Sequence, residues 1–335
     1  MILAIDAMGG DHGLKVTVAA ALLALRAHPM LRLQLVGDQA QLGQALQSAS
    51  GAERSRLDVI HASEVVAMDE LPSKALRGKK DSSMRVAINL VKEGRAQGAV
   101  SAGNTGALMA TAKFVLKTLP GIDRPAICAP MPSTVGRPYM LDLGANAECD
   151  AAQLTQFAVM GSALVTALHG VERPRVALLN IGEEEIKGND AIKAAATALQ
   201  HSGLNYCGYV EGDGIFRGEA DVVVCDGFIG NIALKTGEGV ARLIRDFMKA
   251  EFLASPFSKL AAVIAKPVLT RLAARIDPRN YNGAALLGLN GLVIKSHGGA
   301  DAASFANAIG VAVNAVEHDV IGRTRGLISA AALPQ

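Results

Sequence analysis

The stretch that decides the fold is MILAIDAMGGDHG, residues 1–13, in which an apolar segment leads directly into a glycine-rich turn. Residues 2–6 predict a short buried strand, and residues 14–28 follow with helical periodicity. Gly9, Gly10 and Gly13 permit positive φ and close approach of another group. A strand, a glycine turn and a helix start leave free backbone N–H groups, which α/β proteins commonly use to bind anions.

Strands and helices alternate along the rest of the chain. We expect strands at 32–36, 57–61, 98–101, 126–131, 139–143, 175–180, 205–210, 222–225 and 292–295, and helices at 39–49, 81–95, 104–118, 150–169, 187–201, 230–252 and about 301–319. This alternation predicts an α/β fold, with a mostly parallel sheet covered by helices on both faces. No composition break or linker divides the chain, so we expect a single domain over residues 1–335.

Composition narrows the functional classes. Of the 335 residues, 50% are hydrophobic, which argues against disorder, and the net charge of +2 gives no general preference for nucleic acid. The four cysteines have no C-x-x-C spacing and are expected to be small core residues in a reducing cytosol. We identify no signal peptide and no uncharged apolar run of membrane-spanning length. Dinucleotide, Walker-type and metal-ligand motifs are missing too, so we expect no cofactor and no metal.

Polar and glycine residues gather after six of the expected strands. The six segments are DAMGGDHG (6–13), SAGNTG (101–106), DLGAN (142–146), NIGEEEIKGN (180–189), DGFIGN (226–231) and KSHGGAD (295–301). Turn and helix-cap chemistry explains any one of them, but not six of the same polarity. Because ligands bind at the carboxyl ends of parallel strands, we expect the six segments to meet at one sheet edge and form an active site.

A basic loop, LPSKALRGKK (71–80), precedes a helix start at residues 81–84. Lys74 and Arg77, beside Ser82 and Ser83 at that helix start, form a candidate anion site. A solvated surface loop is the alternative interpretation.

The six segments together resemble the bacterial phosphate acyltransferases of phospholipid synthesis, which make acyl phosphate from acyl-acyl carrier protein and inorganic phosphate. The resemblance rests on residues 5–13, 101–106, 141–146, 179–189, 225–236 and 286–298 and covers essentially the whole chain. Leu14 stands where we expect proline in the family. The resemblance implies a fold related to phosphotransacetylases and isocitrate-type dehydrogenases. It also implies a homodimer that is cytoplasmic and loosely attached to the inner membrane face, beside a downstream glycerol-phosphate acyltransferase.

We expect bound phosphate to attack the thioester directly, since the chain lacks Ser/His/Asp and Cys/His signatures for an acyl-enzyme intermediate. The candidate catalytic residues are Lys187, His297, Asp226, Asn231 and Asp6. The candidate phosphate- and acyl-binding residues are Gly9, Gly10, Asp11, His12, Lys74, Ser82, Ser83, Ser101, Gly103, Asn104, Thr105, Gly106, Asp142, Asn146 and Asn189. Lys187 or His297 would stabilise the oxyanion or protonate the departing sulfur. The aspartates would orient these groups, or serve only as caps.

Residues 242–279 form a basic, apolar segment with eight basic and three acidic side chains. Its apolar residues recur at spacings of three and four, and Pro256 and Pro267 divide it, so we expect a helical hairpin or kinked pair that forms an arm. The arm could pack in a dimer interface, or it could contact an anionic membrane or the acidic carrier protein. The candidate contact residues are Phe257, Lys259, Leu260, Ile264 and Lys266.

Three other functions stay open from the residues alone. A phosphotransacetylase-like enzyme would use acyl-coenzyme A in place of the carrier protein. A dehydrogenase could share the fold, although we identify no nucleotide-binding motif. A membrane scaffold for lipid synthesis would explain the basic segment and leave the strand-end polar segments unexplained.

Overall fold

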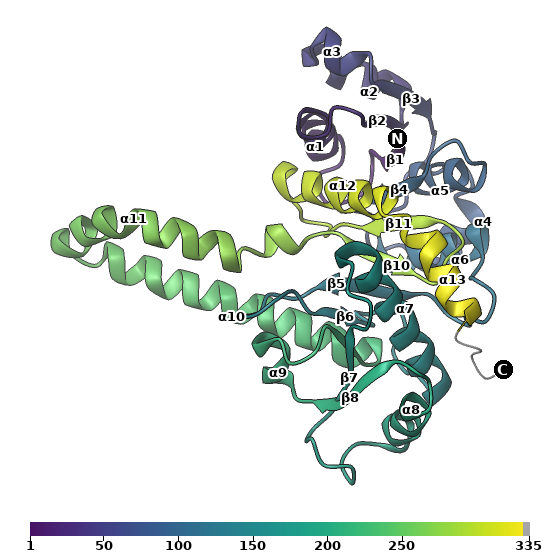
Figure 1. Cartoon of the computed structure of the whole chain (residues 1–335). Coiled ribbons are helices and arrows are strands. Elements are labelled where there is room, and N and C mark those ends of the chain that lie inside the picture. The colour runs from purple at the N-terminus through teal and green to yellow at the C-terminus, as the bar shows by residue number, and fades with distance from the viewer. Residues whose placement is uncertain (331–335) are drawn as a thin grey trace.

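A single 11-stranded sheet runs through the protein in the computed structural model, which describes residues 1–330 (Figure 1). The strand order is β3-β2-β1-β4-β11-β10-β5-β6-β9-β7-β8. The strands are β1 (Ile2–Asp6), β2 (Arg32–Gly37), β3 (Leu57–His61), β4 (Gly98–Ser101), β5 (Ala126–Pro130), β6 (Tyr139–Leu141), β7 (Arg175–Leu179), β8 (Asn205–Val210), β9 (Val222–Val224), β10 (Ala284–Leu287) and β11 (Leu292–Lys295). Residues 331–335 of the expected domain lie outside the described residues.

Helices cover both faces of the sheet, as expected. They are α1 (Leu14–Ala27), α2 (Gln39–Ala45), α3 (Gly51–Arg54), α4 (Pro72–Gly78), α5 (Ser83–Lys92), α6 (Thr105–Leu116), α7 (Ala151–His169), α8 (Asp190–Gln200), α9 (Gly212–Arg217), α10 (Gly227–Leu253), α11 (Pro256–Ile276), α12 (Ala302–Glu317) and α13 (Val320–Ala330). Alternation along β1 shows the two faces: Leu3 and Ile5 join the core under α1 and α12, whereas Ala4 packs with α5.

The sheet is mostly parallel but reverses direction in its middle. β10 is antiparallel to both β11 and β5, and β5 is antiparallel to β6. The remaining described strand pairs are parallel. The carboxyl ends of β1, β4 and β11 therefore lie at one edge, and those of β6, β7 and β9 lie at the other. The prediction that all six polar segments meet at one edge is wrong, because it assumed that every strand runs the same way.

Five elements were not expected from the sequence: the helices α3, α4 and α13, and the two described next. α4 lies within residues 71–80, so the expectation of a loop there is wrong. β10 follows the arm after a short 3₁₀ turn, η2 (Pro278–Tyr281), where we expected no strand. α9 lies between β8 and β9, where no helix was expected. Both are short, and β10 (AALL) carries no alternation of polar and apolar residues that would identify a strand.

The α7 helix corrects a sequence-based exclusion. It is long and apolar enough to cross a membrane by length and composition, although we identified no such run. Within the protein, 78% of its apolar window is buried. Its buried residues, such as Phe157 and Met160, belong to the main core. α7 is thus placed as a core helix of the second half of the sheet.

The arm consists of α10 and α11, which lie side by side and project away from the body (Figure 1). The turn lies at residues 254–255, and Pro256 occupies the first turn of α11, where its missing N–H costs little. Pro267 lies inside α11, which continues past it to Ile276. The hairpin expected at about 242–279 is present, and its first helix begins earlier, at Gly227.

Candidate functional site

A cavity of about 660 Å³ lies between α10 and the middle of the sheet. α10 lines it with polar and charged residues that recur at helical spacing, so they share one face of the helix. These residues are Asn231, Lys235, Glu238, Arg242 and Arg245. The opposite wall comes from β5, β10 and the residues that follow β11.

The floor of the cavity is apolar. Ile127 and Ala129 of β5 line it, together with Leu143 and Leu234. Phe216 of α9 closes one side and packs against Gly237, where an added Cβ would lie 3.2 Å from the ring. Glycine at this position lets the aromatic ring approach the helix closely. The floor can therefore accept a hydrocarbon chain.

His297 stands at the polar end of the cavity, held by the backbone around it. Its N–H donates to Asn282 Oδ1 at 2.9 Å, and Gly299 N–H donates to its Nδ1 at 3.1 Å. Its Nε2 lies 3.4 Å from Lys235 Nζ, close enough for a hydrogen bond in which the ammonium donates. A neutral ring accepts at one nitrogen only, so the hydrogen bonds from Gly299 and from Lys235 are alternatives. Burial and the nearby Lys235 lower the His297 pKa and so favour the neutral ring.

Asp6 lies beneath the site as a fully buried anchor. Ser83 Oγ donates to its Oδ1 at 2.6 Å, and Ser101 Oγ donates to its Oδ2 at 2.6 Å. Burial raises the Asp6 pKa, while these hydroxyls and the N–H groups of Met8 and Gly9 act in the opposite direction. Asp6 therefore ties three loops together, and it does not line the cavity.

Asp142 plays the same part after β6. Its buried carboxylate accepts N–H groups from Ile127, Gly144, Ala145 and Asn146 at 2.7–3.2 Å. Asn146 is buried too, and its side-chain amide donates to the carboxylate and to a backbone carbonyl. Both residues thus shape the loop that brings Gly144 against Asn231 at the cavity wall.

The glycine loops expected to bind phosphate pack closely against neighbouring groups on the side where a Cβ would lie. An added Cβ on Gly9 would lie 2.5 Å from Asp6, and one on Gly10 would lie 2.9 Å from Ala102. Gly103 and Gly106 are similarly blocked, by a methionine and a proline side chain. The Asp11 N–H donates to the Gly298 carbonyl at 2.9 Å, while the side chains of Asp11 and His12 are exposed. These glycines let neighbouring loops touch, and none of the four lines the cavity.

Several other candidate residues serve as helix caps. Ser82, Asn104, Asn189 and Asp226 each accept a backbone N–H at the start of α5, α6, α8 and α10. The Ser82 and Ser83 hydroxyls are buried and engaged within the protein, so they offer no open anion site. Lys74 lines a separate pocket of about 510 Å³.

Lys187 is exposed on the loop after β7 and does not line the cavity. Three of the candidate residues do line it: Thr105, Asn231 and His297.

Proteins of known family resemble this chain over most of its length. The family described as "Fatty acid synthesis protein" matches residues 1–323. The phosphate acyltransferase of Alkalilimnicola ehrlichii is 63% identical over 318 residues, which cover 95% of this chain and 93% of that protein. The phosphate acyltransferase of Halorhodospira halophila is 60% identical, with coverages of 95% and 93%. The chain belongs to the phosphate acyltransferase family.

A solved structure supports the fold independently. A phosphotransacetylase from Streptococcus pyogenes superposes with a TM-score of 0.61 at 19% identity, covering 98% of this chain and 94% of that one. The family resemblance, the α/β fold class and the expectation of an acyltransferase are thereby confirmed. The roles of the individual site residues stay predictions.

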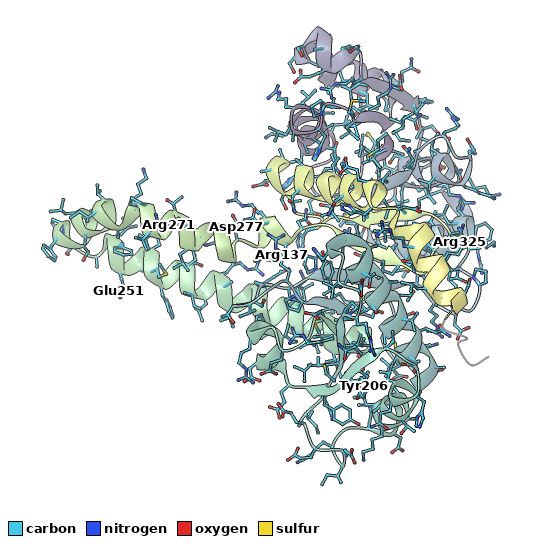
Figure 2. The ribbon with its side chains drawn as sticks, in the orientation of Figure 1. Arg137, Tyr206, Glu251, Arg271, Asp277 and Arg325 are labelled. Atoms are coloured by element: carbon cyan, nitrogen blue, oxygen red, sulfur yellow. The ribbon has the colours of Figure 1, made fainter. Side chains whose placement is uncertain are left out.

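The charged residues that line this cavity were not among the site residues predicted from the sequence. They are Lys235, Glu238, Arg242, Arg245, Asp277, Arg279, Lys295 and Asp301. The α10 residues follow Asn231 at spacings of three and four, a signal that could have found them. Arg279 is held at the base of the arm by Asp277 and Asp301, and Figure 2 shows Asp277 where α11 returns to the body.

Proposed function

We propose that this chain transfers a long-chain acyl group from acyl-acyl carrier protein to inorganic phosphate, giving acyl phosphate for phospholipid synthesis. One observation carries the proposal: a single cavity joins an apolar floor to a wall that presents Lys235 and His297. An acyl thioester needs the first surface and phosphate needs the second. Membership of the phosphate acyltransferase family supports the same reaction.

The reaction proceeds by direct attack of phosphate. A phosphate oxygen forms a bond to the thioester carbonyl carbon, and the C–S bond then breaks with its electron pair passing to sulfur. The thiolate takes up the proton that hydrogen phosphate loses, so no further reactant is required. Positioning and electrostatic stabilisation of the oxyanion supply the catalysis.

The cysteines support a mechanism without an acyl-enzyme intermediate. In the described part of the chain no cysteine lines the cavity. Cys128 and Cys225 are buried, and burial raises both pKa values, which keeps the thiols protonated and unreactive. Lys187 and His297 were the two residues predicted to stabilise the oxyanion or protonate the departing sulfur. His297 is the better placed of the two, because it lines the cavity and Lys187 does not.

The carrier protein would approach along α10. Arg242 and Arg245 continue the cavity lining along α10, and each exposed side chain pairs with a neighbouring carboxylate, of Glu238 and Asp246 respectively. The cavity lining as a whole has five lysine and arginine side chains against three carboxylates, so its net charge is positive. An acidic carrier protein is attracted to such a surface, which raises its association rate. The carrier-protein thioester therefore fits this surface, and acyl-coenzyme A stays the alternative substrate.

The arm carries an apolar tip suited to peripheral contact with an anionic membrane. Phe257 is 80% exposed, and Leu260 and Ile264 are also exposed beside Lys259 and Lys266. Apolar side chains that enter the headgroup region, flanked by lysines, are typical of interfacial helices. A cytoplasmic protein held in this way would release acyl phosphate next to the acyltransferase that consumes it. The same exposed helices can also meet a second subunit in a homodimer.

The substrate is tested by comparing thiol release from carrier-protein and coenzyme A thioesters of equal chain length. We expect a higher kcat/KM for the carrier-protein thioester. The double substitution Arg242→Ala/Arg245→Ala should raise the KM for that thioester, because it removes positive charge from the surface that attracts the acidic carrier protein. Arg95→Ala replaces an exposed arginine that does not line the cavity and serves as the matched control.

Equal efficiency with both thioesters would favour the phosphotransacetylase-like alternative. No phosphate-dependent release from either, by folded protein, would favour the scaffold.

A further inference from the structure

Lys295 is a buried lysine at the end of β11, and no part of the mechanism above uses it. Only 9% of the residue is exposed, yet it lines the polar end of the cavity beside His297. Its Nζ donates to the carbonyl oxygens of Ala102, at 3.4 Å, and Ser296. An ammonium carries three N–H donors, so these two carbonyls do not satisfy it fully.

The charge of Lys295 lacks a close counter-ion in the protein. Within residues 1–330 no carboxylate lies within the 4.0 Å of an ion pair, and Asp6 and Asp11 attract the ammonium only at longer range. Asp6 already accepts hydrogen bonds from two serine hydroxyls. Burial lowers the Lys295 pKa to about 8, and the charge of Lys235 acts in the same direction. Folding thus buries a charge at a cost that an anion in the cavity would offset.

Three basic side chains line the polar end of the same cavity. Lys235 comes from α10, and its Nζ lies 3.4 Å from Nε2 of His297. Lys295 comes from β11, and its ammonium is close enough to Lys235 for the two charges to repel each other. Glu238 neutralises part of the charge of Lys235, at 3.0 Å, and makes no ion pair with Lys295. The cluster therefore keeps an excess of positive charge.

We propose that Lys295 holds the phosphate that attacks the thioester, with Lys235 and His297 as its partners. The inference rests on the proposed function, since it assigns the phosphate subsite of that reaction. It places phosphate beside these three side chains and not at the glycine loops expected from the sequence, which do not line the cavity. Lys295 would be a catalytic residue, because its ammonium touches the nucleophile and stays beside the oxyanion.

Lys295→Gln separates this role from a structural one. Glutamine keeps N–H donors for the carbonyls of Ala102 and Ser296 but removes the charge. We expect the KM for phosphate to rise by about tenfold or more, as for loss of a charge-assisted hydrogen bond, with the KM for acyl-carrier protein unchanged. Lys92→Gln, an exposed lysine on α5, is the matched control and should leave both constants unchanged.

Phosphate binding without thioester gives a readout independent of turnover. In calorimetry with inorganic phosphate alone, the Lys295→Gln protein should lose the binding that wild type shows. If the variant does not fold, Lys235→Gln replaces it. The Lys235 side chain is 46% exposed, and its replacement should raise the KM for phosphate in the same direction.

The outcomes separate the two proposals. If wild type is active and folded Lys295→Gln has the same KM for phosphate, the role of Lys295 is overturned and the transferase function stands. A wild type that binds phosphate through Lys295 but releases no thiol overturns the transferase and leaves the anion site. Wild type that does neither overturns both.

Discussion

At the residue scale, two aspartates show where sequence reasoning stops. Asp6 and Asp142 each follow an apolar strand and were chosen as site residues for that reason. Both are buried with their oxygens occupied by hydroxyl or backbone N–H donors, so they organise loops. A sequence shows that a carboxylate ends a strand, but the donors that surround it come from residues far away in the chain.

Lys295 was overlooked for the opposite reason. It follows three apolar residues of β11, and at a strand end a lysine usually reaches solvent. Its burial depends on packing against the loop at Ala102, which joins β4 to α6. Lys295 reaches this loop because β11 pairs with β4 in the sheet.

The pKa of Lys295 predicts a pH dependence. Its pKa is lowered to about 8 by burial, so the ammonium is present below that pH and is lost as pH rises through it. We expect kcat/KM for phosphate, which at saturating acyl-carrier protein reports the enzyme complex before phosphate binds, to fall above about pH 8. Lys235 disfavours the charged form there, while Asp6 and Asp11 favour it. The profile is measured at saturating acyl-carrier protein.

Lys295→Arg is the control for this profile. Arginine stays charged throughout the range, so the fall near pH 8 should disappear. The same fall in both proteins would assign the titration to another group.

At the element scale, the long periodic segments were predictable and the short ones were not. The strand and helix expected in residues 2–28 are β1 and α1, because Ile2–Asp6 is a compact apolar run and the glycines after it end the strand. β10 was missed because its four consecutive apolar residues show no alternation of polar and apolar positions. Its absence from the expected list hid the point at which the sheet reverses.

The exposed apolar tip of the arm is expected to bind anionic membranes. Phe257→Ser/Leu260→Ser/Ile264→Ser should weaken sedimentation with anionic phospholipid vesicles, because it removes the apolar surface that enters the membrane. The rate with soluble acyl-carrier protein should stay unchanged, since the tip lies away from the cavity. Figure 2 shows Glu251 and Arg271 out along this arm.

Glu251→Gln on the same arm is the control and should bind vesicles at least as well as wild type. Unchanged vesicle binding by the triple variant, together with loss of the dimer, would instead assign the tip to the subunit interface.

At the scale of the whole molecule, the cavity exists because the sheet reverses direction. Where the direction reverses, four neighbouring strands are in register. The paired residues are Ile294 of β11, Ala285 of β10, Cys128 of β5 and Leu141 of β6. β6 and β11 are only three and four residues long, so α10 can contact loops from both edges. Asn231 meets the loop after β6, and one turn later Lys235 meets the residues after β11.

The sequence could predict the fold class, the family and the arm, since each rests on local patterns or on joint motifs. It could not predict the cavity, because the direction of β10 is a tertiary feature. The polar segments were correctly expected at strand ends but were divided between two edges. Of the proposed site residues, Thr105, Asn231 and His297 are brought to the cavity, while Lys187 stays on an exposed loop.

Direct attack of phosphate on the thioester is tested by measuring thiol release before and after phosphate is added. Purified protein is mixed with excess long-chain acyl-carrier protein in phosphate-free buffer, and free thiol is followed over time. We predict no burst of thiol, then steady release with formation of acyl phosphate once phosphate is added. A burst equal to the enzyme concentration before phosphate is added would contradict the account, because it would reveal an acyl-enzyme intermediate.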